Sequence, residues 1–179
     1  MGCVTSTEVN FDDKTFDKTP NFSLTDRFFN VRVVDIYDGD TCVCVLNIFN
    51  TFYKFTIRLI DIDTCEMTSK DNIVKNKAYA TRNRLYELIT KDNSKFDLKL
   101  SRKDLRDKLN SKVYMVSILC GEFDKYGRLL AYLFDVQKGS ISFNIKETYN
   151  HILIKENHAY YYSGDTKLTE NEQILHYKN

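Results

Sequence analysis

The sequence contains no tryptophan, one proline and only six glycines in 179 residues. It has no apolar run of the roughly 18 residues that a membrane-spanning helix needs, and its first residues lack the apolar stretch of a secretory signal. Neither sign of charge dominates, because 26 Lys and Arg face 25 Asp and Glu. These absences argue against a membrane-embedded or secreted chain, and the net charge alone does not indicate a nucleic-acid partner.

The five cysteines are odd in number and show neither a disulfide framework nor paired metal-ligand spacing. Cys42 and Cys44 alternate along one expected strand and would share its inner face. We therefore expect reduced thiols that fill the core, and an intracellular, cytoplasmic protein.

Aromatic residues are plentiful, with 12 Tyr and 12 Phe, so a chain of this length can build one sizeable core. We expect a flexible N-terminal tail over 1–28, a folded domain over 29–168 and a C-terminal tail over 169–179. We expect a monomer.

The residue periodicity predicts an α+β protein with a small, mainly antiparallel sheet. The expected strands are 29–35, 41–48, 52–60, 96–100, 113–120 and 128–135. The expected helices are 71–89, 101–109 and 144–155. In the third strand, alternation buries Ile57 and Leu59 and turns Arg58 to the opposite face.

The N-terminus, Met1-Gly2-Cys3-Val4-Thr5-Ser6, fits the N-myristoylation pattern, with Gly2 as the acylated residue. Cys3 is a candidate for palmitoylation, which would supply the second signal that stable membrane anchoring needs. The sequence thus predicts a lipid anchor on the cytoplasmic face of a membrane. The alternative is a chance hexamer on a disordered tail.

Three short segments carry the residue types that phosphoryl chemistry needs. They are Asp38-Gly-Asp-Thr41, Arg58-Leu-Ile-Asp-Ile-Asp-Thr-Cys-Glu66 and Asp124-Lys-Tyr-Gly-Arg128. Hard cations such as Ca²⁺ prefer carboxylate and carbonyl oxygens. Phosphate prefers guanidinium groups, which bind it with two hydrogen bonds.

In their order and spacing, these segments resemble the staphylococcal (thermonuclease-like) nuclease family, and the likeness runs from about residue 31 to 167. The resemblance implies an OB-fold, a five-stranded Greek-key barrel with about three helices. It also implies a Ca²⁺-dependent phosphodiesterase that cleaves DNA and RNA, preferring single strands, and leaves 3′-phosphate ends.

The resemblance assigns the metal to Asp40, Asp63 and the backbone carbonyl of Thr64. It assigns the scissile phosphate to Arg58 and Arg128. Taken singly, the two aspartates also suit a turn and a strand end, and the two arginines suit surface ion pairs.

Glu66 is implied as the general base or as the residue that orients the attacking water. The resemblance assigns nucleotide contacts to Lys125, Tyr126, Tyr160 and Tyr162. In an alternating strand Tyr160 and Tyr162 share one face, so at least one tyrosine of residues 160–162 is expected in the core. Glu66 also suits a plain surface position.

Two departures from the family stand out. Cys65 occupies the place of a usual proline, which would loosen the loop that carries Glu66. Residues 91–112 hold eight Lys and Arg against four Asp, which either extends a nucleic-acid track or forms a solvated face. None of the histidines is assigned to metal or catalysis. The rival interpretation is a non-catalytic module that binds nucleic acid or protein while tethered to a membrane.

Overall fold

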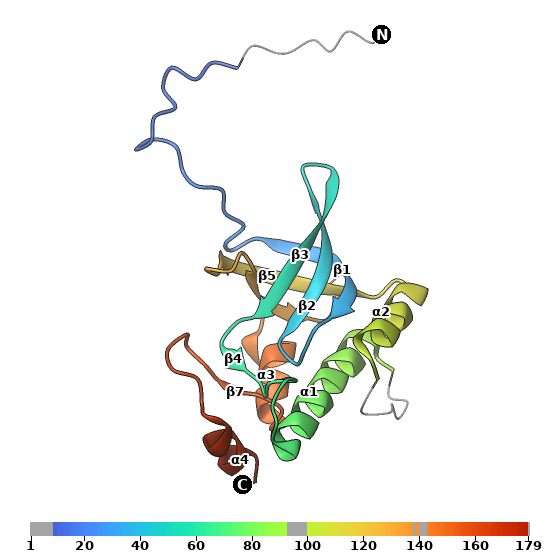
Figure 1. Cartoon of the computed structure of the whole chain (residues 1–179). Coiled ribbons are helices and arrows are strands. Elements are labelled where there is room, and N and C mark those ends of the chain that lie inside the picture. The colour runs from blue at the N-terminus through green and yellow to red at the C-terminus, as the bar shows by residue number, and fades with distance from the viewer. Residues whose placement is uncertain (1–8, 93–99, 138, 140–142, 179) are drawn as a thin grey trace.

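The computed structural model describes residues 9–92, 100–137, 139 and 143–178 (Figure 1). The strands are β1 (Phe28–Ile36), β2 (Thr41–Ile48), β3 (Thr51–Leu59), β4 (Ile62–Asp63), β5 (Met115–Phe123), β6 (Leu129–Phe134) and β7 (Tyr160–Tyr161). The helices are α1 (Asn72–Thr90), α2 (Arg102–Ser111), α3 (Tyr149–Lys155) and α4 (Glu170–Lys178), and a 3-10 turn, η1, spans Ile145–Glu147.

Five strands form a closed barrel in the order β1-β2-β3-β6-β5. Strand β1 pairs antiparallel with both β2 and β5, while β3 and β6 run parallel where they meet. Closure leaves the barrel without an open edge. The expected α+β fold with a five-stranded OB-type barrel is therefore confirmed.

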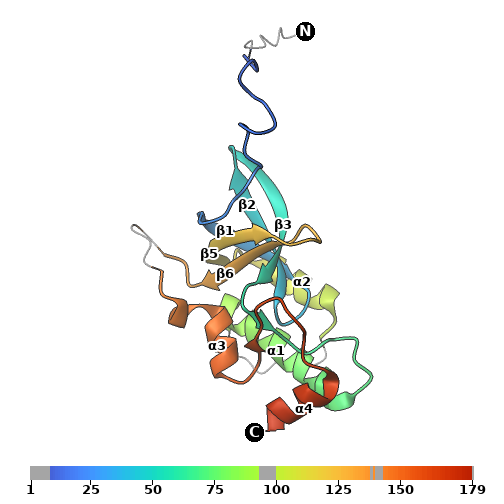
Figure 2. The ribbon, with the colours of Figure 1, turned by 90° about the vertical axis from the view of Figure 1, so that its left-hand side faces the viewer.

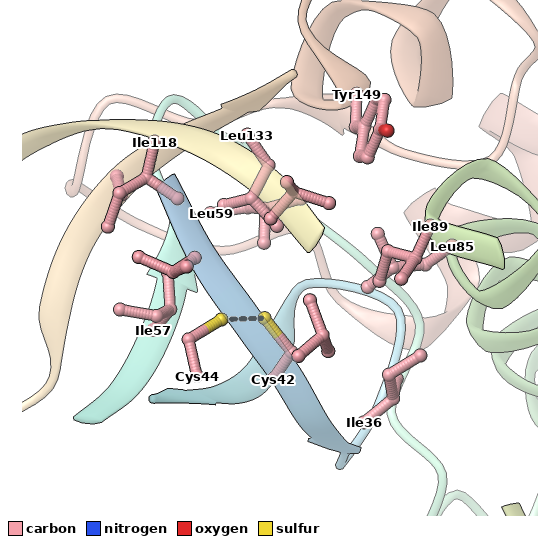
Figure 3. Close-up of a cluster of buried hydrophobic side chains, with 14 of the residues drawn as sticks. Ile36, Cys42, Cys44, Ile57, Leu59, Leu85, Ile89, Ile118, Leu133 and Tyr149 are labelled. Carbon is pink, nitrogen blue, oxygen red and sulfur yellow. Dashed lines mark hydrogen bonds between the residues drawn. The ribbon is translucent and has the colours of Figure 1, made fainter. Parts of the chain in front are cut away.

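The barrel interior is filled by aliphatic side chains and thiols (Figure 3). Ile57 and Leu59 are buried, as the alternation in the third strand predicted. Cys42 and Cys44 are also buried, and their sulfur atoms lie 3.8 Å apart. The four described cysteines are free thiols.

Helix α1 starts where the sequence placed it, because the Asp71 carboxylate caps it by accepting hydrogen bonds from the backbone N–H groups of Ile73 and Val74 at 2.7 and 3.0 Å. Its buried Leu85, Leu88 and Ile89 join the hydrophobic core of the barrel. Helix α2 is capped in the same way by Ser101 and packs against β1.

The structure corrects the expected helix over 144–155. Residues 145–147 form a 3-10 turn, and Thr148 is extended, with φ −74° and ψ 148°. The Thr148 hydroxyl accepts a hydrogen bond from the backbone N–H of His151, so it starts a new helix there. The expected strand over 96–100 lies almost wholly outside the described residues.

The residues expected as a C-terminal tail form helix α4, which packs on α1. Its Ile174 and Tyr177 contact a small cluster made of Cys65, Val74 and Ala78. This fourth α-helix therefore lies over the loop that follows β4. Among the described residues, no helix is both long and apolar enough to cross a bilayer.

Candidate active site

The Asp38–Thr41 segment is a tight turn into β2. The backbone N–H of Tyr37 donates to the Thr41 carbonyl at 2.8 Å, and the Asp38 carboxylate accepts from the Asp40 N–H at 3.1 Å. A Cβ atom added to Gly39 would lie 2.4 Å from a methyl group of Thr81 on α1. Only glycine lets the turn approach α1 so closely, and this approach fixes Asp40 at the strand start.

Arg58 comes from the end of β3, opposite Thr41 in the strand pairing. It points away from Ile57 and Leu59, as expected, but its guanidinium is buried rather than open to solvent. One terminal nitrogen donates to the carbonyls of Leu59 and Ile62 at 2.8 and 2.9 Å. These two carbonyls hold the guanidinium plane in place.

Arg58 is the shared cation of two buried carboxylates. Its other terminal nitrogen donates to Asp63 Oδ1 at 2.8 Å, and its Nε lies 3.3 Å from Asp40 Oδ1. The relative exposures of Asp40 and Asp63 are only 5% and 1%. Burial of this kind is tolerated because each charge has a partner of opposite sign.

The remaining carboxylate oxygens are also bonded within the chain. Thr64 Oγ1 donates to Asp40 Oδ2 at 2.9 Å, and Thr41 Oγ1 donates to Asp40 Oδ1 at 2.9 Å. The Tyr160 hydroxyl donates to Asp63 Oδ2 at 2.5 Å. Tyr160 is buried and does not line the pocket described below, so this geometry favours a role in positioning Asp63.

A second cation reaches this group from the segment before α4. The Lys167 ammonium lies 2.9 Å from Asp63 Oδ1 and 3.2 Å from Glu66 Oε1. Burial alone would lower the pKa of Lys167, but its hydrogen bond to Asp63 and the charges of Asp63 and Glu66 raise it above the usual value. Lys167 therefore stays charged and stands where a cation can contact both carboxylates.

A pocket of about 470 Å³ opens beside the buried Arg58. Arg128 lines it from the other side, with its Nε donating to Asp124 Oδ2 at 2.7 Å. Asp124 also accepts hydrogen bonds from the backbone N–H groups of Tyr126 and Arg128, both at 2.9 Å. The turn with Gly127 at φ 78° thus orients Arg128 toward the space that Arg58 faces.

Three more of the expected substrate contacts surround this pocket. Lys125, Tyr126 and Tyr162 all line it. The Tyr126 ring is 73% exposed, with the Lys125 Nζ 5.2 Å and the Arg128 Cζ 5.5 Å from its centroid. An exposed ring flanked by two cations can stack on a base while the cations bind phosphate.

Glu66 lies at the rim and does not line the pocket. Its side chain is 60% exposed, and its described partner is Lys167. The neighbouring Cys65 is buried against α4, and burial raises the pKa of its thiol to about 11. Contacts with α4 thus support the loop at Cys65, where the sequence departs from the family that it resembles.

Sequence reasoning did not single out Asp38 or Lys167. Burial, together with the charge of Asp40, raises the pKa of Asp38 to about 7. The Asp-x-Asp spacing of residues 38 and 40 could have indicated such a coupled pair. Nothing near Lys167 in the sequence could have indicated its contacts, because they span about a hundred residues.

Part of the basic segment over 91–112 serves the fold. Arg102 and Arg106 on α2 both donate to the buried Asp35 carboxylate, at 2.6 and 2.9 Å. Lys91 pairs with Asp135. These partners favour the structural interpretation for three of its eight cations. Gly2 and Cys3, the predicted lipidation sites, lie outside the described residues.

Comparison with known proteins adds no assignment, since neither a family model nor a curated protein matches this sequence. The geometry itself defines a pocket on a closed barrel, flanked by two arginines and backed by two buried aspartates. The atoms that could ligate a cation here, the Asp40 and Asp63 carboxylates and the oxygens of Thr64, are all oxygens, which suits a hard cation and not zinc.

Proposed function

We propose that this protein is a calcium-dependent nuclease of the staphylococcal nuclease type. It would hydrolyse phosphodiester bonds of DNA and RNA, preferring single strands, and leave 3′-phosphate ends. One observation carries the proposal. Arg58 and Arg128 line the same pocket, and Arg58 is also the shared partner of Asp40 and Asp63.

Asp40, Asp63 and the Thr64 carbonyl would hold Ca²⁺, which takes roughly six to eight oxygen ligands and so leaves room for water and phosphate. The contact of the Lys167 ammonium with Asp63 supports the fit of one proposed ligand, because a cation already lies 2.9 Å from that carboxylate. When bound, Ca²⁺ supplies electrophilic polarisation of a phosphate oxygen.

The two arginines would donate hydrogen bonds to the non-bridging oxygens of the scissile phosphate. Negative charge builds on those oxygens as water attacks phosphorus, and fixed donors aimed at it are worth several kcal/mol, about 3 for one donor. The carbonyls of Leu59 and Ile62 hold Arg58, and Asp124 holds Arg128, so both guanidinium groups are fixed beside the pocket. Arg58 would share its N–H groups between the phosphate and its present partners, Asp40 and Asp63.

Glu66 would orient the attacking water and accept its proton. In the structure Glu66 is paired with Lys167, so it would have to break that ion pair before it could bind the attacking water. Tyr126 would stack on the base next to the scissile bond, while Lys125 binds a flanking phosphate. The bond between phosphorus and the 5′-oxygen would break as the water oxygen bonds to phosphorus, and solvent would protonate the departing 5′-oxygen.

A second candidate function rests on the saturation of the carboxylates. Because Arg58, Lys167 and Tyr160 already satisfy Asp63, the pocket presents Arg128 and Lys125 as a cationic surface without any metal. A non-catalytic module that binds single-stranded nucleic acid would need no more than this.

Cleavage of a fluorescent single-stranded oligonucleotide, with Ca²⁺ or with a chelator, separates the two functions. We expect Ca²⁺-dependent cleavage that Asp40→Asn and Arg128→Ala each reduce by at least about a hundred-fold. The matched control is Arg27→Ala, because Arg27 is exposed and lies outside the pocket. Binding without cleavage in Ca²⁺ would support the second function and contradict the first.

A further inference from the structure

Strands β2 and β3 extend beyond the barrel as a long hairpin, at the end of the molecule away from α4 (Figures 1 and 2). Ile48 pairs with Thr51, so only Phe49 and Asn50 form the loop. Both have positive φ, 51° and 61°, which is the signature of a type I′ turn.

Phenylalanine is an unusual choice at this turn position. Type I′ turns favour Asn, Asp and Gly, because other side chains are strained at positive φ. Phe49 is also 85% exposed, so it gains little from packing in return. A residue that both strains the backbone and exposes apolar surface suggests a role outside the folding of this chain.

Phe49 belongs to an apolar, uncharged tip. Phe52 is 72% and Phe22 is 60% exposed, and the Phe22 and Phe49 ring centroids lie 6.5 Å apart. Residues 46–53 contain no charged side chain. The tip can therefore leave water without desolvating a charge. Such a surface suits the boundary between lipid headgroups and acyl chains, whereas binding to nucleic acid would favour cations.

The tip lies far from the proposed active site. Arg58 and Phe52 are six residues apart on β3, which corresponds to about 20 Å along the strand. The tip is thus free to contact another surface while the pocket binds substrate.

The N-terminal segment supplies the second observation. Its described part contacts the hairpin, because the ring of Phe22 lies against that of Phe49. The predicted acylation motif belongs to the same segment, at residues 1–6. A single acyl chain binds membranes only marginally, and residues 7–17 offer no basic patch as a second signal.

We propose that Phe49, Phe52 and Phe22 form a membrane anchor that inserts into the interface of a lipid bilayer and acts together with the predicted acyl group at Gly2. The tip then provides a second signal of its own, through apolar burial rather than charge and independent of palmitoylation at Cys3. Binding should accordingly not require anionic lipid. The barrel would then stand on the membrane with its pocket about 20 Å along β3 from the inserted tip.

The lack of tryptophan gives a direct test. Phe49→Trp introduces a single tryptophan into the full chain, which is titrated with neutral phosphatidylcholine vesicles, with and without prior N-myristoylation. We expect a blue-shifted emission that brominated lipid quenches, at lower lipid concentration for the acylated protein. The control is Ile73→Trp, since Ile73 is 52% exposed at the start of α1, toward the other end of the molecule. No shift for the Phe49→Trp protein in either form, or equal shifts at both positions, would overturn the proposal.

A second pair of variants separates membrane contact from folding. Phe49→Asn suits the turn better, so we expect its Tm to rise by about 2 °C. Vesicle binding of Phe49→Asn/Phe52→Ser should nevertheless fall at least about ten-fold, because two phenylalanines that would insert into the bilayer are lost. Unchanged vesicle binding, or a loss of oligonucleotide binding instead, would refute the membrane role.

Discussion

We expect Lys167 to compete with a cation that binds at Asp63, and replacing Lys167 tests this expectation. Its ammonium lies 2.9 Å from Asp63 Oδ1 and 3.2 Å from Glu66 Oε1. A metal that takes Asp63 as a ligand must displace this ammonium or share the carboxylate with it. Lys167→Met keeps the aliphatic stem and removes only the charge.

The expected size of the effect follows from the exposure of the pair. Lys167 is about half exposed, which keeps each contact near the 0.2–1 kcal/mol of surface ion pairs, although the burial of Asp63 favours the upper end. The two contacts together contribute about 1–2 kcal/mol. Removing them should tighten Ca²⁺ binding by about five- to thirty-fold.

Isothermal titration of the full chain with Ca²⁺ measures this directly. Lys125→Met is the matched control, because it removes a positive charge from the pocket without a described contact to Asp63. An affinity for the Lys167→Met protein that is unchanged, or no tighter than that of the control, would show that Lys167 does not compete with the metal.

The other predictions concern binding, stability and pH. Tyr126→Ala should weaken binding of a single-stranded oligonucleotide about ten-fold, because one stacking contact with a base is lost. Tyr160→Phe should leave that affinity within about two-fold. A larger loss for Tyr160→Phe, measured by fluorescence anisotropy, would place the Tyr160 side chain in the substrate site. Arg58→Met leaves the buried Asp63 without its principal cation and should lower the free energy of unfolding in urea by about 3 kcal/mol; a loss under about 1 kcal/mol would contradict the charge sharing. Burial, aided by the charge of a nearby lysine, lowers the pKa of His158 from 6.5 to about 4, so over this range the unfolded chain takes up a proton that the folded chain does not. The His158 contribution should therefore lower stability by about 1–2 kcal/mol between pH 7 and 5, while Asp38, whose pKa is raised to about 7, acts in the opposite direction over the same range. The difference in unfolding free energy between the wild type and His158→Gln, measured in urea at each pH, isolates the His158 contribution; a difference that does not change with pH would argue against the lowered pKa.

Local patterns predicted much of the barrel. Alternation in β3 was sufficient to bury Ile57 and Leu59, and the spacing of Cys42 and Cys44 was sufficient to place both thiols inside, because a strand has a fixed period of two. The caps of α1 and α2 could also be located, since a cap is a contact between residues two or three apart.

What the sequence did not predict depends on contacts across the chain. Alternation predicted a core tyrosine within residues 160–162, and Tyr160 is buried, but its hydrogen bond to Asp63 spans 97 residues and has no local signal. The same holds for Lys167 and for α4, which is held by its packing on α1 and Cys65. Thr148 can either continue a helix or start a new one by capping it with its hydroxyl group, and hydrophobic periodicity does not distinguish the two outcomes.

The Ca²⁺-dependence and end chemistry of cleavage test the central claim most directly. A defined single-stranded oligonucleotide is incubated with the full chain, with Ca²⁺ or with a chelator, and the fragments are weighed by mass spectrometry. The account predicts fragments that end in 3′-phosphate with Ca²⁺, and intact oligonucleotide with the chelator. An intact oligonucleotide under both conditions, or equal cleavage in the chelator, would contradict it.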